Sequence, residues 1–288
     1  MTYGELYREG DRRLEKAGVL DHAVDARYLI GFVFDMDLTC YLMKKDDLIA
    51  DSTAADRYRQ LIAKRAEGVP LQYLTGSASF MGLDFHVNES VLVPRQDTET
   101  LVEKALEYLG QMDRPAVLDL CTGSGCIIIS LAVLADLGLG VGADISEDAL
   151  ETARWNASDL APGVRMIKSD MFESVEGTFD MIVSNPPYIA SELIDGLMRE
   201  VRDHEPRGAL DGGADGLYFY RILAARAGDF LNPGGRLLME IGYDQADAVR
   251  ELLADQGWLD LEVIKDLAGN DRVVSCRRKT DQRSMRYV

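Results

Sequence analysis

The sequence predicts an α/β protein in which a doubly wound parallel sheet follows a smaller helical domain. From Pro115 onward, short apolar segments alternate with helical ones, a rhythm typical of parallel strands joined by right-handed crossovers. Before about residue 75, apolar residues instead recur at helical spacing. The chain has 288 residues, of which 47% are hydrophobic, so it can bury one large core and one smaller one.

We expect residues 1–75 to form the helical domain. Helical spacing is clearest at Tyr28, Leu29, Phe32 and Val33, and again at Tyr58, Leu61 and Ile62. Residues 76–94 are expected to form a β-hairpin linker, because Gly82 separates two apolar alternations. The helix after the linker is predicted to have Asp97 as its N-cap.

Residues 95–288 are predicted to form the sheet domain. Its candidate strands are 116–120, 139–143, 164–167, 181–184, 236–241, 261–264 and 273–276. Its candidate helices after the first strand are 126–137, 146–159, 192–199, 215–230 and 244–256. The last two strands have no helix between them, so we expect them to close one edge of the sheet antiparallel.

Composition argues against several classes of protein. The formal net charge of -18 disfavours general binding to nucleic-acid backbones, which attract clustered Lys and Arg. The four cysteines include no Cys-x-x-Cys pair and the three histidines are scattered, so we expect neither a disulfide framework nor a metal site. The N-terminus has no secretory pattern, and the longest apolar run is too short to span a membrane. We therefore expect a cytoplasmic protein.

A glycine loop follows the first sheet strand, where open α/β sheets bind ligands. It contains Cys121, Thr122, Gly123, Ser124 and Gly125. Such a loop alone is a weak signal, because a tight turn without a ligand has the same pattern. Asp144 strengthens it, since a carboxylate at the end of the next strand can accept both hydroxyls of a ribose.

The bound nucleoside is expected to lack a pyrophosphate, because Ile128 stands where a dinucleotide fingerprint has its third glycine. S-adenosylmethionine has an adenosine and no phosphate, and Asp119 could contact its amino-acid end. Asp170, Met171 and Phe172 are placed to border the adenine, although simple core packing explains Met171 and Phe172 equally well.

The tetrapeptide Asn185-Pro186-Pro187-Tyr188 follows another strand and therefore lies at the same edge of the sheet. An amide or exocyclic amino nitrogen is a poor nucleophile because its lone pair is delocalised. The Asn185 side-chain oxygen and the Pro186 carbonyl can hold such an NH2 group, and Tyr188 offers it a flat face. A proline-rich turn without chemistry is the competing interpretation, which the glycine loop and Asp144 make less favoured.

With these motifs, the sequence resembles the N(5)-glutamine methyltransferase family that modifies peptide chain release factors. The resemblance covers residues 60 to 277, roughly, and includes several further motifs. These are Pro70–Gly76, Phe80–Phe85, Val91–Glu99, Glu205–Leu217 and Gly269–Val274. Three positions depart from the family pattern: Gln96 replaces a proline, Cys121 a frequent glycine and Met171 a tryptophan. None removes a catalytic group, but Cys121 and Met171 bear on cofactor affinity.

The resemblance implies a seven-stranded, Rossmann-like S-adenosylmethionine-dependent methyltransferase domain and an N-terminal helical domain that helps to dock the protein substrate. Family members methylate the side-chain amide nitrogen of the glutamine in the Gly-Gly-Gln motif of release factors, releasing S-adenosyl-L-homocysteine. The candidate cofactor-binding residues are Asp119, Cys121, Thr122, Gly123, Ser124, Gly125, Asp144, Ile145, Asp170, Met171, Phe172 and Asn185. The candidate catalytic and substrate-binding residues are Asn185, Pro186, Pro187 and Tyr188.

Three alternatives remain open at this point. A methyltransferase for a glutamine of a ribosomal protein would use the same chemistry. An adenine-N6 methyltransferase acting on DNA or RNA would use the same tetrapeptide, but the acidity of the chain disfavours it. A protein that only binds a partner would be expected to have lost cofactor or catalytic residues, and these are present.

Overall fold

The computed structural model describes residues 1–279, so positions 280–288 of the expected sheet domain lie outside the described residues. The chain forms two compact units. The helical unit consists of Met1–Ser77 together with Met198–His204, and the sheet unit contains Ala78–Leu197 and the chain from Glu205 onward. The assignment of residues 198–204 to the helical unit was not anticipated from the sequence.

The helical unit contains α1 (Tyr3–Lys16), α2 (His22–Phe34), α3 (Leu38–Lys44), α4 (Ser52–Ala66), α5 (Leu71–Thr75) and α9 (Arg199–His204). Polar side chains begin several of these helices: Thr2 forms a capping box with Glu5, and Asp51 accepts two backbone hydrogen bonds at the start of α4. Tyr58 is fully buried and donates its hydroxyl to the Ala26 carbonyl.

A buried ion cluster explains why α9 belongs to the helical unit. Arg65 of α4 contacts Asp25 of α2 at 2.6 Å and Glu200 of α9 at 2.7 Å. The side chains of Arg65 and Asp25 are only 9% and 7% exposed, so loss of Arg65 would leave the buried Asp25 carboxylate without its cation. The predicted helix 192–199 is replaced by the 3-10 helix η1 (Ser191–Gly196) and α9, because the backbone is extended at Leu197 between them.

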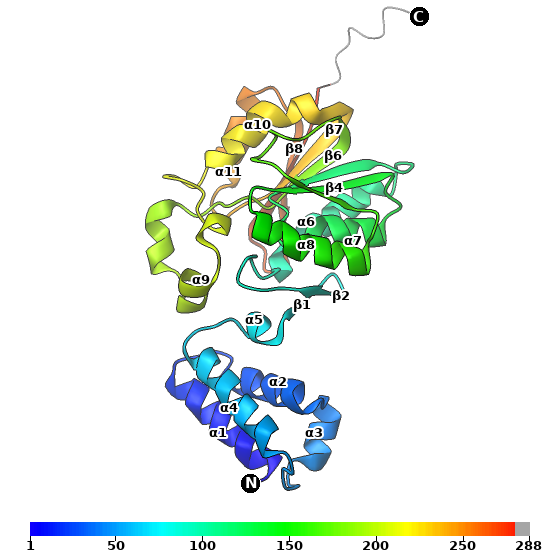
Figure 1. Ribbon diagram of the computed structural model, residues 1–288. Coiled ribbons are helices and arrows are strands. Elements are labelled where there is room, and N and C mark those ends of the chain that lie inside the picture. The colour runs from blue at the N-terminus through cyan, green and yellow to red at the C-terminus, as the bar shows by residue number, and fades with distance from the viewer. Residues whose placement is uncertain (280–288) are drawn as a thin grey trace, which may run out of the picture. The chain divides into compact units, whose positions relative to one another are not determined.

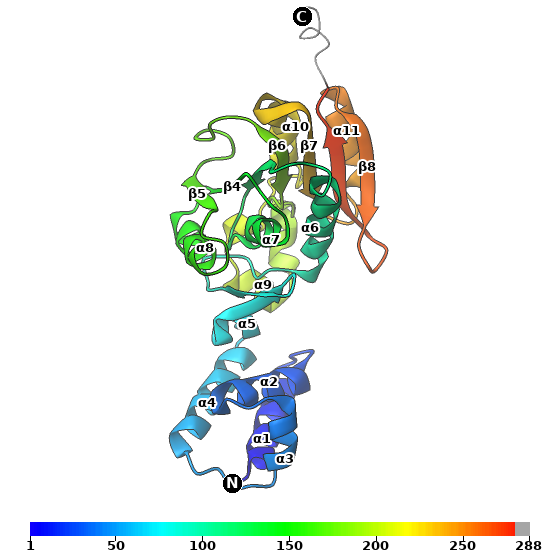
Figure 2. The same cartoon turned by 90° about the vertical axis from the view of Figure 1, so that its right-hand side faces the viewer.

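The sheet has seven strands in the order β5-β4-β3-β6-β7-β9-β8, with β5 and β8 at its two edges (Figure 2). Their bounds are β3 (Ala116–Leu120), β4 (Leu139–Asp144), β5 (Arg165–Lys168), β6 (Phe179–Ser184), β7 (Leu231–Glu240), β8 (Leu259–Lys265) and β9 (Asp271–Arg277). Strands β3 to β7 pair in parallel, whereas β9 pairs antiparallel with both β7 and β8. The predicted fold class and the antiparallel edge are therefore confirmed.

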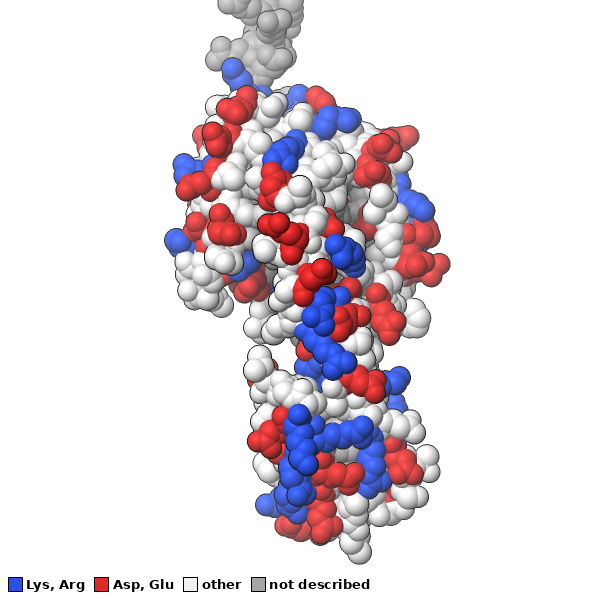
Figure 3. Space-filling view, turned by 90° about the vertical axis from the view of Figure 1, so that its left-hand side faces the viewer, with Lys and Arg blue, Asp and Glu red and all other residues white. Residues whose placement is uncertain are grey.

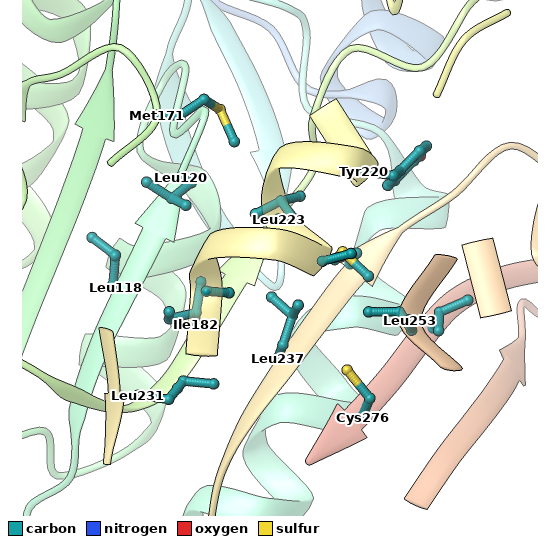
Figure 4. Packing of buried hydrophobic residues seen from close by; sticks show 14 of the residues in the cluster. Leu118, Leu120, Met171, Ile182, Tyr220, Leu223, Leu231, Leu237, Leu253 and Cys276 are labelled. Atoms are coloured by element: carbon teal, nitrogen blue, oxygen red, sulfur yellow. The ribbon is translucent and has the colours of Figure 1, made fainter. Parts of the chain in front are cut away.

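Two layers of helices cover the sheet, with α6 (Gln96–Leu109), α7 (Cys126–Leu134) and α8 (Glu147–Leu160) on one face (Figure 1). The other face carries α10 (Tyr218–Phe230) and α11 (Ala246–Asp255). Residues alternate between these faces along each strand, so Leu118 and Leu237 pack toward α10 and α11 (Figure 4). Val117 and Leu238 belong to the core beneath α6 and α7.

Several predicted boundaries differ from the structure for local reasons. Strand β7 begins at Leu231, because Leu231 already pairs with Phe179 of β6. Helix α10 begins at Tyr218, after Gly216 has adopted a positive φ of 72°. The N-cap prediction for Asp97 is wrong: α6 begins at Gln96, and Asp97 lies inside its first turn.

A β-hairpin precedes α6. Strands β1 (Ser77–Phe80) and β2 (Leu83–His86) are joined by Met81 and Gly82, both with positive φ, as a type I′ turn requires. Phe80 and Phe85 from the two strands belong to the core beneath α6 and α7. The hairpin therefore packs as part of the sheet unit.

One view of the surface shows different charge distributions on the two units. Lys and Arg side chains gather on one face of the helical unit, whereas both signs are scattered over the sheet unit in the same view (Figure 3). Within residues 1–279, no helix is both long and apolar enough to cross a membrane. That part of the chain also contains no group of three or more His, Cys, Asp or Glu residues arranged to hold a metal ion.

Candidate active site

A pocket of about 520 Å³ opens at the carboxyl ends of β3, β4, β5 and β6. After β3 the chain adds β4 and β5 on one side of it and then β6 and β7 on the other, so the strand order reverses beside β3. Such a reversal leaves a crevice at the carboxyl ends of the strands. The volume lies within the range of pockets that hold small-molecule cofactors. The wall contains the following predicted residues: Cys121, Thr122, Gly123, Ser124, Asp144, Ile145, Asp170, Met171, Asn185 and Pro187.

The glycine loop is shaped by positive φ angles, at 54° for Gly123 and 81° for Gly125. Gly125 needs glycine for its positive φ, whereas an added Cβ would meet mainly the movable end of the Ile129 side chain, at 2.8 Å from Cδ1. Gly125 then becomes the N-cap of α7. The Ser124 carbonyl accepts a hydrogen bond from Asn156 Nδ2, which connects the loop to α8.

Asp144 ends β4 and faces the pocket from beside the loop. Its Oδ2 accepts the Gly123 N–H and its Oδ1 accepts the Ser146 N–H, both at 2.9 Å. Each carboxylate oxygen keeps further acceptor capacity, because an ionised carboxylate offers about four lone-pair sites. Burial raises the pKa of Asp144, while these backbone donors oppose the shift.

Asp119 occupies a different position from the one expected. It is fully buried and does not line the pocket. Its Oδ2 accepts the Thr122 hydroxyl at 2.6 Å, whereas Oδ1 has no hydrogen-bond partner among the described residues. Burial raises its pKa to about 7, against hydrogen bonds from Thr122 and the Ile128 amide. Asp119 therefore supports the loop from below, and its direct contact with a cofactor stays a prediction.

The two departures Cys121 and Met171 contact each other. The Cys121 sulfur lies 3.8 Å from the Met171 sulfur, and both residues have positive φ, at 59° and 46°. The Met171 carbonyl accepts the Ser169 hydroxyl, which stabilises this turn. Phe172 points away from the pocket and stacks on Phe230, consistent with the core-packing interpretation for that residue.

The tetrapeptide follows β6 directly, and two of its four members line the pocket. Asn185 and Pro187 line the pocket, whereas Pro186 and Tyr188 are absent from its wall. Asn185 Nδ2 donates to the Thr98 hydroxyl at 3.2 Å. The Pro186 carbonyl makes no hydrogen bond within residues 1–279. Burial raises the pKa of Tyr188 to about 12, so its phenol is neutral at physiological pH.

Glycine also supports the tetrapeptide from a later segment. The Gly212 N–H donates to the Ile189 carbonyl at 2.8 Å. A Cβ on Gly212 would lie 2.8 Å from Tyr188 Cα and 2.9 Å from the Pro187 carbonyl oxygen. Only glycine allows this close approach of two backbones. Gln245 completes the support by donating from Nε2 to the Tyr188 carbonyl at 2.9 Å.

Sequence reasoning missed much of the pocket wall. The unpredicted part comes mainly from the segment that leads into α6 and its first turn, from the turn after α9 and from the start of α10. It includes Pro94, Arg95, Thr98, Pro206, Tyr218 and Phe219. The motifs Val91–Glu99 and Glu205–Leu217 cover the first two segments, but the resemblance of these stretches to the family assigned no role to their individual residues. Tyr218 and Phe219 had no signal beyond the apolar start of a helix.

Two family models match the chain. The model described as the PrmC N-terminal domain matches residues 5–76, and the model described as the methyltransferase small domain matches residues 97–200. The first lies in the helical unit, and the second contains the glycine loop, Asp144 and the tetrapeptide.

Relatives of similar length match almost the whole chain. The release factor glutamine methyltransferase of Agrobacterium fabrum is 43% identical, over 93% of this chain and 94% of the relative. That of Moorella thermoacetica is 41% identical, over 98% of this chain and 100% of the relative. Among solved structures, the 16S rRNA N2 G1207 methyltransferase of T. thermophilus is 20% identical, with a TM-score of 0.51 over 70% of this chain and 50% of that one. That likeness concerns the fold alone.

Proposed function

Because the chain belongs to the release factor glutamine methyltransferase family, we propose that it methylates the glutamine side-chain amide in the Gly-Gly-Gln motif of peptide chain release factors. It is an S-adenosylmethionine-dependent methyltransferase. One observation supports the substrate chemistry above all. Asn185 and Pro187 line the same pocket as the glycine loop and Asp144, so a planar amide and the methyl donor would share one cavity.

The residues present fit S-adenosylmethionine. Asp144 keeps acceptor capacity for the ribose hydroxyls, and the turn at Gly123 leaves open space where another residue would have a Cβ. Asp170 and Met171 line the pocket beside this carboxylate and would border the adenine. When bound, S-adenosylmethionine supplies an electrophilic methyl group on a sulfonium.

The protein's contribution is to orient the substrate nitrogen. The Asn185 Oδ1 would accept one amide N–H of the glutamine, and the Pro186 carbonyl, which has no other partner within residues 1–279, would accept the other. Two acceptors in fixed positions direct the nitrogen lone pair away from them and toward the donor side of the pocket. They also stabilise the positive charge that develops on the nitrogen before its proton is lost. The neutral Tyr188 phenol adds no competing charge.

A direct assay tests this proposal. The protein is incubated with a class-one release factor and labelled S-adenosylmethionine, and the factor is then analysed by peptide mass mapping. We expect one methyl group on the Gly-Gly-Gln peptide. The same factor with that glutamine changed to alanine is the matched control and should stay unlabelled. Label on a ribosomal protein or on DNA or RNA, with none on the release factor, would refute the substrate assignment.

Asp144→Asn is expected to raise the dissociation constant for S-adenosylmethionine about tenfold to 100-fold. Both Asp144 oxygens accept backbone N–H groups, so an amide in its place must direct its own NH2 at one of those donors. The substitution also removes the negative charge of Asp144, which strengthens hydrogen bonds from the ribose hydroxyls. Calorimetric titration measures the effect. Asp148→Asn, an exposed change close by, is the control, and equal affinities for the two variants would contradict the role of Asp144.

A further inference from the structure

The side chain of Asn185 is held by a hydroxyl from another element. Thr98 lies in the first turn of α6, is 2% exposed, and accepts a hydrogen bond from Asn185 Nδ2 at 3.2 Å. A hydroxyl has a single proton to donate. If Thr98 accepts from Asn185, its own O–H is free to donate to a second group.

The second group is the carboxyl of Glu240, which ends β7. Helix α6 packs on β7 (Figure 2), and hydrogen bonding from the Thr98 side chain lowers the pKa of Glu240. Glu240 is 1% exposed, and its Oε2 has no hydrogen-bond partner among the residues described. A carboxyl that is buried so completely, with one oxygen unsatisfied, is costly and calls for a specific reason.

The groups around Glu240 shift its pKa in opposite directions. Burial raises its pKa to about 7, Asp97 adds to the shift, and the hydrogen bond from Thr98 together with the nearby Arg272 and Arg95 lowers it. The remaining titratable groups whose charges interact with Glu240 are Cys126, Tyr188 and Tyr220. The Tyr220 hydroxyl donates to the backbone carbonyl of Glu240 and not to its carboxyl. Near neutral pH, the carboxyl therefore exists in both protonation states.

We propose that Thr98 and Glu240 are positioning residues that set the orientation of the Asn185 amide. The Glu240 carboxylate accepts the Thr98 O–H, so the Thr98 oxygen can only accept, and Asn185 must turn its NH2 group toward it. The Asn185 Oδ1 then faces the substrate as an acceptor. The inference rests on the proposed function, because a flipped Asn185 would present donors to the donors of the glutamine amide.

A second ion cluster secures the turn that carries Thr98. Arg272 of β9 contacts Asp97 and Asp266, each at 3.1 Å. Asp97 precedes Thr98 in α6, so this contact ties the start of the helix to the sheet. The late motif Gly269–Val274 thereby acquires a role at the active site, although it does not line the pocket.

Substitutions of Thr98 test by enzyme kinetics whether its hydroxyl positions Asn185. Thr98→Val keeps the shape and removes both hydrogen bonds, and we expect kcat to fall about tenfold to 100-fold with little change in S-adenosylmethionine affinity. Thr98→Ser should restore kcat to within about threefold of the wild type, because the hydroxyl is regained. Thr152→Val is the matched control, since Thr152 is 4% exposed and accepts from Asn88 Nδ2 at 3.0 Å. Equal losses for Thr98→Val and Thr152→Val would overturn the proposal.

The pH dependence of kcat distinguishes a positioning role of Glu240 from a purely structural one. Protonation removes the negative charge that orients the Thr98 O–H, so kcat of the wild type should fall as the pH drops through about 7. Glu240→Gln is neutral and cannot titrate, so its kcat should show no such decline and should stay near the low-pH level of the wild type. Asp119 has a pKa in the same range. A decline that persists in Glu240→Gln would assign it to another group and refute the role of Glu240.

A measurement without substrate keeps this inference separate from the proposed function. In ¹⁵N spectra, the side-chain NH2 signal of Asn185 is identified by its loss in Asn185→Ala. We expect its position to change with pH around 7 in the wild type, and the change to be absent in Glu240→Gln and in Thr98→Val. A signal that is insensitive to pH would overturn the inference. Failure of the wild type to methylate a release factor would refute only the proposed function.

Discussion

Asn185→Ala is expected to lower kcat about 100- to 1000-fold, the size of effect seen when one preorganised polar contact to a reacting group is removed. Its Oδ1 is one of only two acceptors assigned to the substrate NH2, and the alanine side chain cannot replace it. S-adenosylmethionine affinity should stay close to that of the wild type, because the glycine loop and Asp144 are held by their own backbone contacts. Steady-state kinetics and calorimetric titration measure the two quantities.

The control for this variant is Asn232→Ala. Asn232 is also partly buried and donates from Nδ2, at 2.7 Å, to Asp180. It lies near the start of β7, and Asn185 follows the end of the parallel neighbour β6, so the two lie at opposite ends of the sheet. Asn232→Ala should keep normal turnover even if it melts at a lower temperature. Normal turnover in Asn185→Ala would show that the tetrapeptide does not orient the substrate.

Gly212→Ala should lower kcat about 100-fold, because a displacement of reacting groups by about 1 Å has effects of this size. The added Cβ would lie within 3 Å of three backbone atoms, those of Tyr188, Pro187 and Gly216. Backbone cannot rotate away as a flexible side chain can, so the tetrapeptide must shift. Gly212 does not line the pocket, and S-adenosylmethionine affinity should change little.

Gly196→Ala supplies the comparison for Gly212→Ala. It adds the same methyl group in η1, where no atom lies within 4 Å of the new Cβ. We expect its kcat and melting temperature to match those of the wild type. Thermal unfolding of both variants, measured with and without cofactor, distinguishes a displaced loop from an unfolded protein. Full activity of a folded Gly212→Ala variant would contradict the support assigned to this glycine.

The fold was predicted correctly where a pattern of neighbouring residues determines the secondary structure. All seven candidate strands occur, because short apolar runs between turn residues report directly on burial in a parallel sheet. Boundaries were less accurate where tertiary pairing extends an element, as at the start of β7. The helix expected at 192–199 failed for a similar reason: part of that segment packs with the helical unit through Glu200 and Arg65.

The prediction of the site was uneven for the same physical reason. Glycine loops, strand-end carboxylates and proline-rich turns are local, and the structure brings the loop, Asp144 and Asn185 to one pocket. The pocket wall does not include Asp119, Gly125, Phe172, Pro186 or Tyr188. Alternation along β3 explains the first of these, because Asp119 shares the face of Val117 and points beneath α7.

By itself, the sequence determined the order of strands and helices, the loop that follows β3 and the tetrapeptide that follows β6, since each depends on neighbours in the chain. Only the tertiary structure decided which distant residues meet them. Thr98 in α6, Gly212 in the loop before α10 and Glu240 at the end of β7 approach the tetrapeptide, and no periodic pattern in the sequence predicts these contacts. Such contacts depend on strand order and helix packing, which are set by the burial of the whole core.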